Sequence, residues 1–161
     1  MKNLTLRKAI EMAVVTEELG AKYYRKIAKK FSGESKIARI FDQLAQDEVA
    51  HETQFKKLLE EVPPGRHSGE DSGLVLRAAA ISQFFDQKAL GNDEQIMSSQ
   101  DALIRALAFE RSTLFYYQSL RDILGDSPQL EKMIEAERSH VVVLMKVIVS
   151  DAKFRGLADP W

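Results

Sequence analysis

The sequence predicts an all-α protein built from four long helices, arranged as two antiparallel helix hairpins. Apolar residues recur at intervals of three and four along four segments, which is the spacing of one helical face. No stretch shows the apolar and polar alternation, bounded by turns, that is typical of a β-strand. The two halves of the chain also carry similar motifs in the same order. These observations predict a single domain over residues 1–161, formed by a duplicated hairpin.

The first hairpin is expected over residues 6–62. The apolar face of its first helix begins at Leu6, and Gly33 interrupts the pattern. A second helical pattern resumes at Ile37 and ends at Pro63. Because only a few residues separate the two helices, they should pack antiparallel.

A long crossover is expected over residues 63–97, between the hairpins. The polar stretch "VPPGRHSGEDSG" predicts a loop, and "LVLRAAAISQFFDQKAL" predicts a short helix after it. His67 lies in the polar loop and is interpreted as a surface residue rather than a ligand.

The second hairpin is expected over residues 98–150. Its first helix follows "SSQD", and the turn before its second helix is "GDSP". In that turn Ser127 can cap the next helix, and Pro128 suits the first helical position. The C-terminal tail, residues 151–161, ends in Trp161, which could dock on the bundle or on a partner subunit.

Composition excludes several classes of function. Lys and Arg number 23 against 24 Asp and Glu, so no basic field indicates nucleic acid or an anionic membrane. The absence of Cys excludes disulfides, thiolate nucleophiles, Cys-based zinc sites and iron–sulfur centres. The strongly apolar run Val141–Met145 is far shorter than the roughly 20 residues of a membrane span. A cytoplasmic protein is therefore expected.

Ionisable residues interrupt the apolar face of every predicted long helix. Four carboxylates meeting in one core would repel each other unless they are protonated or neutralised by cations. Two divalent cations would match their charge, with neutral imidazoles completing the ligands. A lone Glu-x-x-His pair is usually just solvated, but here two such pairs accompany two single Glu residues, the ligand pattern of dinuclear carboxylate bundles. This donor set favours Fe or Mn, without excluding Zn. The six predicted ligands are Glu17, Glu48, His51, Glu110, Glu137 and His140.

The motifs "EELGAKYY", "DEVAHETQF", "ERSTLFYY" and "ERSHVVV" occur in that order, and together they resemble the rubrerythrin-like branch of the ferritin-like superfamily. The resemblance covers residues 6–62 and 98–150. It implies a ferritin-like four-helix bundle that holds two iron ions. It also implies roles for the ligands: terminal for Glu17 and Glu110, bridging for Glu48 and Glu137, and one metal each for His51 and His140.

Two tyrosines accompany the ligands. Tyr24 and Tyr117 lie two turns beyond the single Glu residues and could donate hydrogen bonds to ligating carboxylates, or could serve only as core aromatics. Typical rubrerythrins carry a further Glu one turn after the Glu of the third long helix. Here Thr113 stands at that position and Gly20 at its equivalent, so the ligand exchange associated with that Glu is in doubt.

The resemblance implies a non-haem di-iron oxidoreductase that reduces hydrogen peroxide or dioxygen, and a homodimer. Typical members also carry a rubredoxin-like domain with four Cys, which this chain lacks. Electrons would therefore come from an external donor protein or from Fe(II) itself. Three alternatives stay open: a ferroxidase that stores or delivers iron, a bundle whose metals are only structural, and a substrate hydroxylase with an organic-substrate channel.

Overall fold

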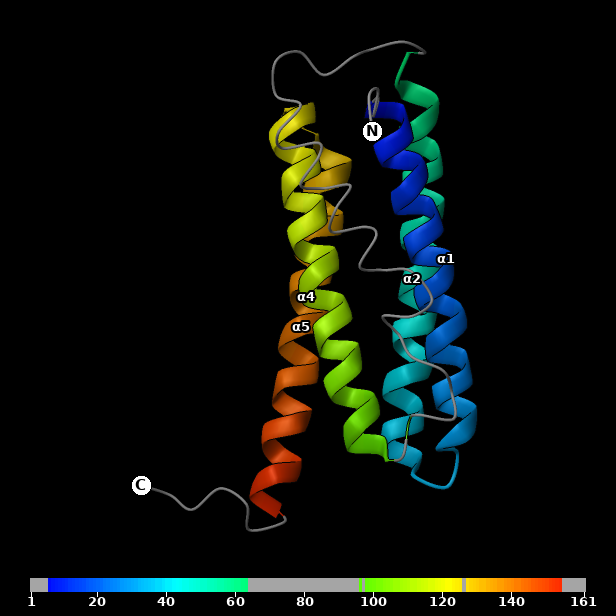
Figure 1. The fold of residues 1–161 in the computed structure, drawn as a ribbon, viewed down its shortest axis with the longest axis vertical. Helices are drawn as coiled ribbons and strands as arrows, with labels where there is room; N and C mark the ends of the chain where they lie inside the picture. The colour runs from blue at the N-terminus through cyan, green and yellow to red at the C-terminus, as the bar shows by residue number, and fades with distance from the viewer. Residues whose placement is uncertain (1–5, 64–95, 97, 126, 155–161) are drawn as a thin grey trace.

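The computed structural model describes residues 6–63, 96, 98–125 and 127–154. Its secondary structure consists of four α-helices: α1 (Leu6–Lys30), α2 (Ser35–Glu61), α4 (Ser99–Leu124) and α5 (Pro128–Phe154). Helices α1 and α2 pack as one antiparallel hairpin and α4 and α5 as the other, so the prediction of an all-α four-helix bundle is confirmed (Figure 1). The predicted crossover helix, His67 and residues 155–161 of the predicted tail, with Trp161, lie outside the described residues, whereas residues 151–154 belong to α5.

The connectivity gives each hairpin a fixed direction in the bundle. Helix α2 ends at the end of the bundle where α1 begins, whereas α4 begins at the opposite end (Figure 1). Helices α2 and α4 therefore run in the same direction, and the end of α2 and the start of α4 lie at opposite ends of the bundle. This arrangement is typical of four-helix bundles whose hairpins are joined by a long crossover.

Local signals set the ends of the second hairpin. The Ser98 hydroxyl caps α4 by accepting a hydrogen bond from the backbone N–H of Asp101 (3.1 Å). Gly125 ends α4 with a φ of 76°, a left-handed conformation that glycine adopts without steric strain. The Ser127 hydroxyl then accepts from the N–H of Leu130 (3.4 Å), as the sequence predicts for the start of the next helix.

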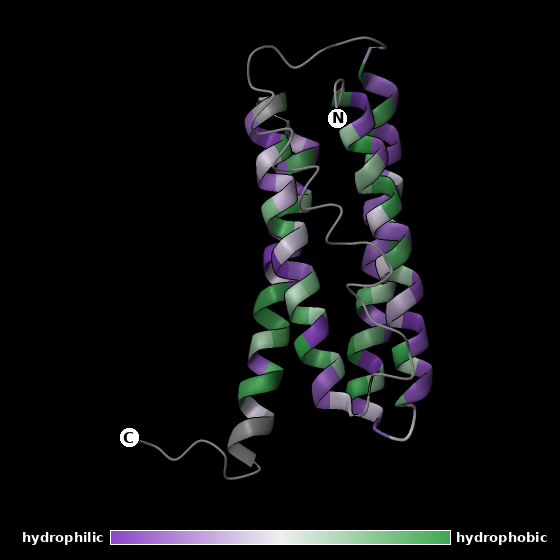
Figure 2. Cartoon of the chain, viewed as in Figure 1, coloured by the Kyte–Doolittle hydropathy of each residue, from purple (hydrophilic) through white to green (hydrophobic). Residues whose placement is uncertain are grey.

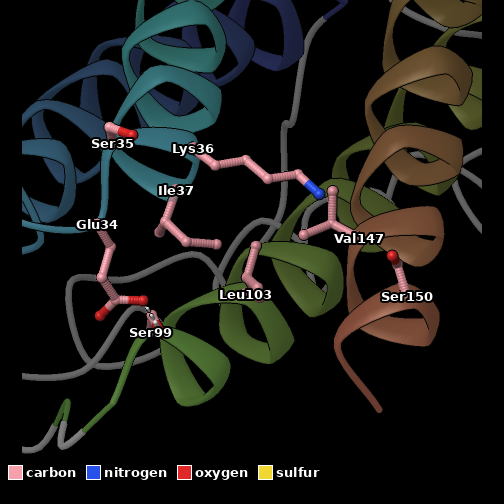
Figure 3. A pocket seen from close by; sticks show the side chains of 8 residues that line it. All are labelled: Glu34, Ser35, Lys36, Ile37, Ser99, Leu103, Val147 and Ser150. Atoms are coloured by element: carbon pink, nitrogen blue, oxygen red, sulfur yellow. Dashed lines mark hydrogen bonds between the residues drawn. The ribbon is translucent and has the colours of Figure 1, made fainter. Parts of the chain in front are cut away.

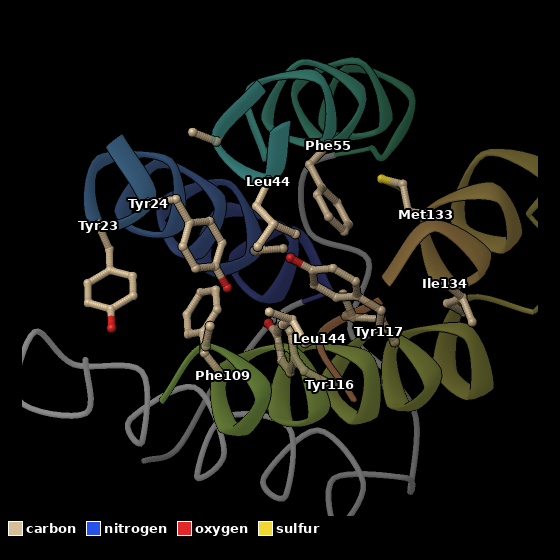
Figure 4. Packing of buried hydrophobic residues seen from close by; sticks show 14 of the residues in the cluster. Tyr23, Tyr24, Leu44, Phe55, Phe109, Tyr116, Tyr117, Met133, Ile134 and Leu144 are labelled. Atoms are coloured by element: carbon tan, nitrogen blue, oxygen red, sulfur yellow. The ribbon is translucent and has the colours of Figure 1, made fainter. Parts of the chain in front are cut away.

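Aromatic side chains join the two hairpins in the core. The rings of Phe55 and Tyr117 lie 4.6 Å apart between α2 and α4, and Tyr24 meets Phe109 edge-on at 6.1 Å between α1 and α4 (Figure 4). The Tyr116 hydroxyl donates to a backbone oxygen of α1, at 2.5 Å. Such aromatic contacts add stability beyond the area that they bury.

The distribution of hydrophobic and hydrophilic residues along the helices agrees with a core between the two hairpins. Hydrophobic and hydrophilic residues are interleaved along each helix, as expected for helices with one buried face (Figure 2). Within the described ranges, no helix has an apolar stretch long enough to cross a membrane.

Candidate metal centre

The structure brings all six predicted ligands together in the core. Every helix contributes, because α1 and α4 carry the single Glu residues and α2 and α5 carry the Glu-x-x-His pairs. All four carboxylates are fully buried, and the two imidazoles are only 4% and 6% exposed. The residues are Glu17, Glu48, His51, Glu110, Glu137 and His140.

The six side chains form two overlapping groups of four. One group contains Glu17 and His51, the other contains Glu110 and His140, and both include Glu48 and Glu137. Within each group, one oxygen or nitrogen per residue lies within 4.8 Å of the others. Two cations placed in these groups would share two carboxylates.

Both imidazoles turn the same atom toward the carboxylates. Nδ1 of His51 lies 2.8 Å from Glu137 Oε1 and 3.5 Å from Glu17 Oε2. Nδ1 of His140 lies 3.2 Å from Glu110 Oε2 and 3.6 Å from Glu48 Oε1. The ring centroids of the two histidines are 5.4 Å apart. Each histidine therefore presents one nitrogen lone pair or one N–H to the centre of the cluster.

Most of the polar atoms in this cluster lack hydrogen bonds. In the described part of the chain, no partner satisfies either oxygen of Glu17, Glu48 or Glu137, or Nδ1 of His51. The 2.8 Å approach between His51 and Glu137 brings the two atoms together without hydrogen-bond alignment. Buried polar atoms are nearly always paired, and leaving them unpaired costs about 1–3 kcal/mol each. Oxygen and imidazole donors aimed at one space fit divalent cations.

Burial favours the protonated form of three of the carboxyls. Burial raises the pKa of Glu17 to about 8. Burial, together with the charges of neighbouring carboxylates, raises the pKa of both Glu48 and Glu137 well above the usual range. Without cations, burial thus favours protons on these carboxyls over ionisation.

The remaining charge is shared by one ion pair. For His140, burial opposes the charged imidazole, but the hydrogen bond and charge of Glu110 outweigh it and raise the pKa to about 9. For Glu110, burial raises the pKa, but the hydrogen bonds with His140, Glu137 and Tyr24 and the charge of His140 together outweigh it, so the pKa is lowered. Burial and the charge of His140 lower the pKa of His51 to about 4. Metal binding would have to displace protons from this arrangement.

The two predicted tyrosines behave differently. The Tyr24 hydroxyl donates a hydrogen bond to Glu110 Oε1 across the hairpin interface. The Tyr117 hydroxyl is buried and has no hydrogen-bond partner among the described residues, although its ring packs on Phe55. Only Tyr24 thus contacts a predicted ligand in the way that the sequence suggests.

Sequence reasoning missed one residue that contacts the cluster. Oδ2 of Asp47 lies 3.2 Å from Nε2 of His140, on the side of the ring that faces away from the carboxylates. The available signal was a difference between the halves, since Asp47 precedes the first Glu-x-x-His motif and Ala136 precedes the second.

The positions that lack the seventh carboxylate are tightly packed. Thr113 is fully buried, and its hydroxyl donates to the backbone oxygen of Phe109 (3.1 Å). A Cβ added to Gly20 would lie 3.0 Å from Phe109 Cε1 and 3.1 Å from Glu48 Oε2. Phe109 thus fills the space beside Gly20, and the described residues offer only four carboxylates to the cluster.

A surface pocket at one end of the bundle is separate from this cluster. It lies where α2 and α4 begin and α5 ends, and the Ser99 hydroxyl donates to Glu34 Oε2 there (2.8 Å; Figure 3). None of its lining residues belongs to the cluster: Glu34, Ser35, Lys36, Ile37, Ser99, Leu103, Val147 and Ser150.

Comparison with known families gives a match over the first part of the chain. The family model described as Rubrerythrin matches residues 8–90, which is more than half of the 161-residue chain. The matched range includes Glu17, Glu48 and His51 and ends before α4. No curated protein and no solved structure matches the chain.

Proposed function

Because the chain belongs to the rubrerythrin family, we propose that it is a non-haem di-iron oxidoreductase that reduces hydrogen peroxide or dioxygen. The observation that carries the proposal is the pair of buried Glu/His groups that share two carboxylates. The electrons would come from a donor centre outside these 161 residues, which contain no Cys, or from Fe(II) itself.

The geometry suggests which residues hold each ion. Glu17 and His51 would bind one ion, and Glu110 and His140 the other. Glu48 and Glu137 belong to both groups and would bind both ions. A bound pair of ferrous ions would supply the two electrons that break an O–O bond.

The protein would contribute by positioning the ligands, excluding water and balancing the charge of the ions. Every proposed ligand is at most 6% exposed, so bulk water is excluded. The oxygens of Glu48 and Glu137 have no hydrogen-bond partners among the described residues, so these carboxylates are free to adjust when the metal charge changes. Glu110, by contrast, is held by Tyr24.

The test begins with metal content and anaerobic loading. Protein loaded with Fe(II) without oxygen should bind about two Fe per chain. Adding hydrogen peroxide should oxidise both ions, with one peroxide consumed for each pair, and the near-ultraviolet absorption should rise. The same protein mixed with dioxygen gives the comparison between oxidants. Faster reaction with dioxygen, followed by release of Fe(III), would instead indicate a ferroxidase.

Two Glu→Gln variants make the test specific. Glu48→Gln removes a shared carboxylate and should abolish binding of the ion pair. Glu135→Gln makes the same chemical change on the exposed face of α5, where the Glu135 carboxylate pairs with Arg138, and should retain both ions. Circular dichroism checks that both variants stay helical. Equal iron content in the two variants, or wild-type protein that binds no metal, would refute the di-iron site.

A further inference from the structure

The two halves of the cluster repeat the ligands but not the side chains around them. In each hairpin a single Glu faces a Glu-x-x-His pair, and a tyrosine follows the single Glu two turns later. Among the described residues, however, the hydrogen bonds that Tyr24 and Asp47 make to ligands both fall on the group that contains Glu110 and His140. This asymmetry does not follow from the duplicated motifs.

Asp47 supports His140 from the other hairpin. Its Oδ2 lies 3.2 Å from Nε2 of His140, while its Oδ1 accepts a hydrogen bond from Gln43 (2.9 Å). The carboxylate is therefore held from two sides although its side chain is 37% exposed. When a cation displaces the Nδ1 proton of His140, a carboxylate in this place keeps the other proton on Nε2 and raises the basicity of the imidazole.

His51 has no equivalent support. Ala136 occupies in α5 the place that Asp47 has in α2, one residue before the Glu of the Glu-x-x-His motif, and a methyl group cannot accept a hydrogen bond. In the described ranges, Nε2 of His51 has no hydrogen bond or ion pair, and all contacts of this ring with acids are made by Nδ1. Among the described residues, no hydrogen bond to Nε2 therefore fixes the orientation of His51.

The single Glu residues of the two hairpins also differ in their hydrogen bonds, and again the better supported one lies beside His140. Glu110 receives the hydroxyl of Tyr24 and also lies 3.2 Å from Nδ1 of His140. Both oxygens of Glu17 and the hydroxyl of Tyr117 lack hydrogen-bond partners in the part of the chain that the structure describes. Glu110 is thus preorganised for a ligand, and Glu17 is not.

We propose that the two metal positions are unequal, and that Asp47 acts as a positioning residue that makes the Glu110/His140 position the tighter one. The inference rests on the proposed dinuclear site and adds an order of filling to it. Removing a carboxylate that orients a metal-binding histidine typically weakens metal binding about 10–100-fold. The first cation therefore enters beside His140, and the second enters beside His51 with lower affinity.

Zn²⁺ is a suitable probe because it is diamagnetic and does not change its oxidation state. Long-range ¹H–¹⁵N spectra separate the imidazole nitrogens, and the chain has only three histidines. At one equivalent of Zn²⁺, the His140 nitrogens should shift to a metal-bound Nδ1 and a protonated Nε2. The His51 nitrogens should shift only as the second equivalent is added. Simultaneous shifts, or His51 shifting first, would overturn the inference.

Variants at Asp47 and Ala136 test the cause of the asymmetry. Asp47→Ala should weaken the first Zn²⁺ step about 10–100-fold and leave the second nearly unchanged, whereas Asp47→Asn, which keeps an acceptor oxygen, should recover part of the affinity. Ala136→Asp should tighten the second step. An Asp47→Ala isotherm identical to that of the wild type would refute the role of Asp47.

Failure of this inference can be told apart from failure of the proposed function. Two equal binding steps, insensitive to Asp47, would refute the inequivalence and leave the dinuclear site intact. Absence of Zn²⁺ and Fe²⁺ binding in the wild type would refute the site itself and the inference with it.

Discussion

The metal-free protein should lose stability as the pH rises from 6.5 to 8. In this range the folded state holds a proton on Glu17, whose pKa is raised to about 8, while the unfolded carboxyl has already lost it. It also holds a proton on His140, whose pKa is raised to about 9 from an ordinary value of 6.5. Both stabilising contributions are fully present below the unfolded pKa and are lost as the pH rises through the folded pKa.

The size of this loss follows from the two pKa values. A group that is protonated only in the folded state changes the free energy of unfolding by about 1.4 kcal/mol per pH unit. Integrated from pH 6.5 to 8, Glu17 and His140 together should reduce the stability by about 3 kcal/mol. The raised pKa values of Glu48 and Glu137 act in the same direction. His51, with a pKa lowered to about 4, contributes only below about pH 6.5, where its effect has the opposite sign.

Urea unfolding in the presence of a chelator measures this slope. Far-ultraviolet circular dichroism at several pH values between 6.5 and 8 should give a falling free energy of unfolding. Glu17→Gln should reduce the fall by about 1.5 kcal/mol, since it removes the titrating proton of Glu17 and leaves those of the other buried groups. Glu11→Gln alters a half-exposed carboxylate on the same helix and should leave the slope unchanged. A free energy that stays constant or rises over this range would refute the protonation scheme.

Three further predictions concern the same cluster. Zn²⁺ binding at pH 7 should release several protons, because the ion replaces protons on buried carboxyls. Calorimetry in buffers of different ionisation enthalpy counts the released protons. A binding heat that does not depend on the buffer would contradict this prediction. Gly20→Ala should weaken Zn²⁺ binding and lower the stability by about 1 kcal/mol, because the new Cβ crowds Glu48, whereas Gly33→Ala, with open space around it, should do neither. Tyr24→Phe should destabilise the metal-free protein by about 1–2 kcal/mol through loss of its hydrogen bond to Glu110. Tyr117→Phe removes an unpaired hydroxyl and should cost less, so equal losses would contradict the asymmetry.

Sequence patterns were enough to predict the helices and the composition of the cluster. A charged residue on an apolar helical face stands out because burial of a lone charge is unfavourable, and this is how Glu17 and Glu110 were found. The spacing of three residues in Glu-x-x-His then places both side chains on one face. These inferences needed only the periodicity of a single helix.

Contacts between the hairpins could not be predicted in this way. The approach of Asp47 to His140 joins side chains on α2 and α5, and it depends on how the two hairpins are rotated against each other. The difference between Tyr24 and Tyr117 has the same origin, since both have the same position relative to the preceding Glu. Phe109 fills the space beside Gly20 from another helix, which no spacing within α1 indicates.

The difference between positions within one helix and contacts between hairpins explains how a duplicated hairpin can yield a metal site with unequal halves. The ligands of both hairpins lie together at the centre of the bundle, where the buried carboxylates of either hairpin have to be neutralised. One layer further out, the two sides have different neighbours: Asp47 is partly exposed and Ala136 cannot take its place. A partly exposed position can exchange Asp for Ala without leaving a buried charge unpaired. It is therefore in this outer layer that the two halves are free to differ, and there that the relative affinity of the two metal positions would be set.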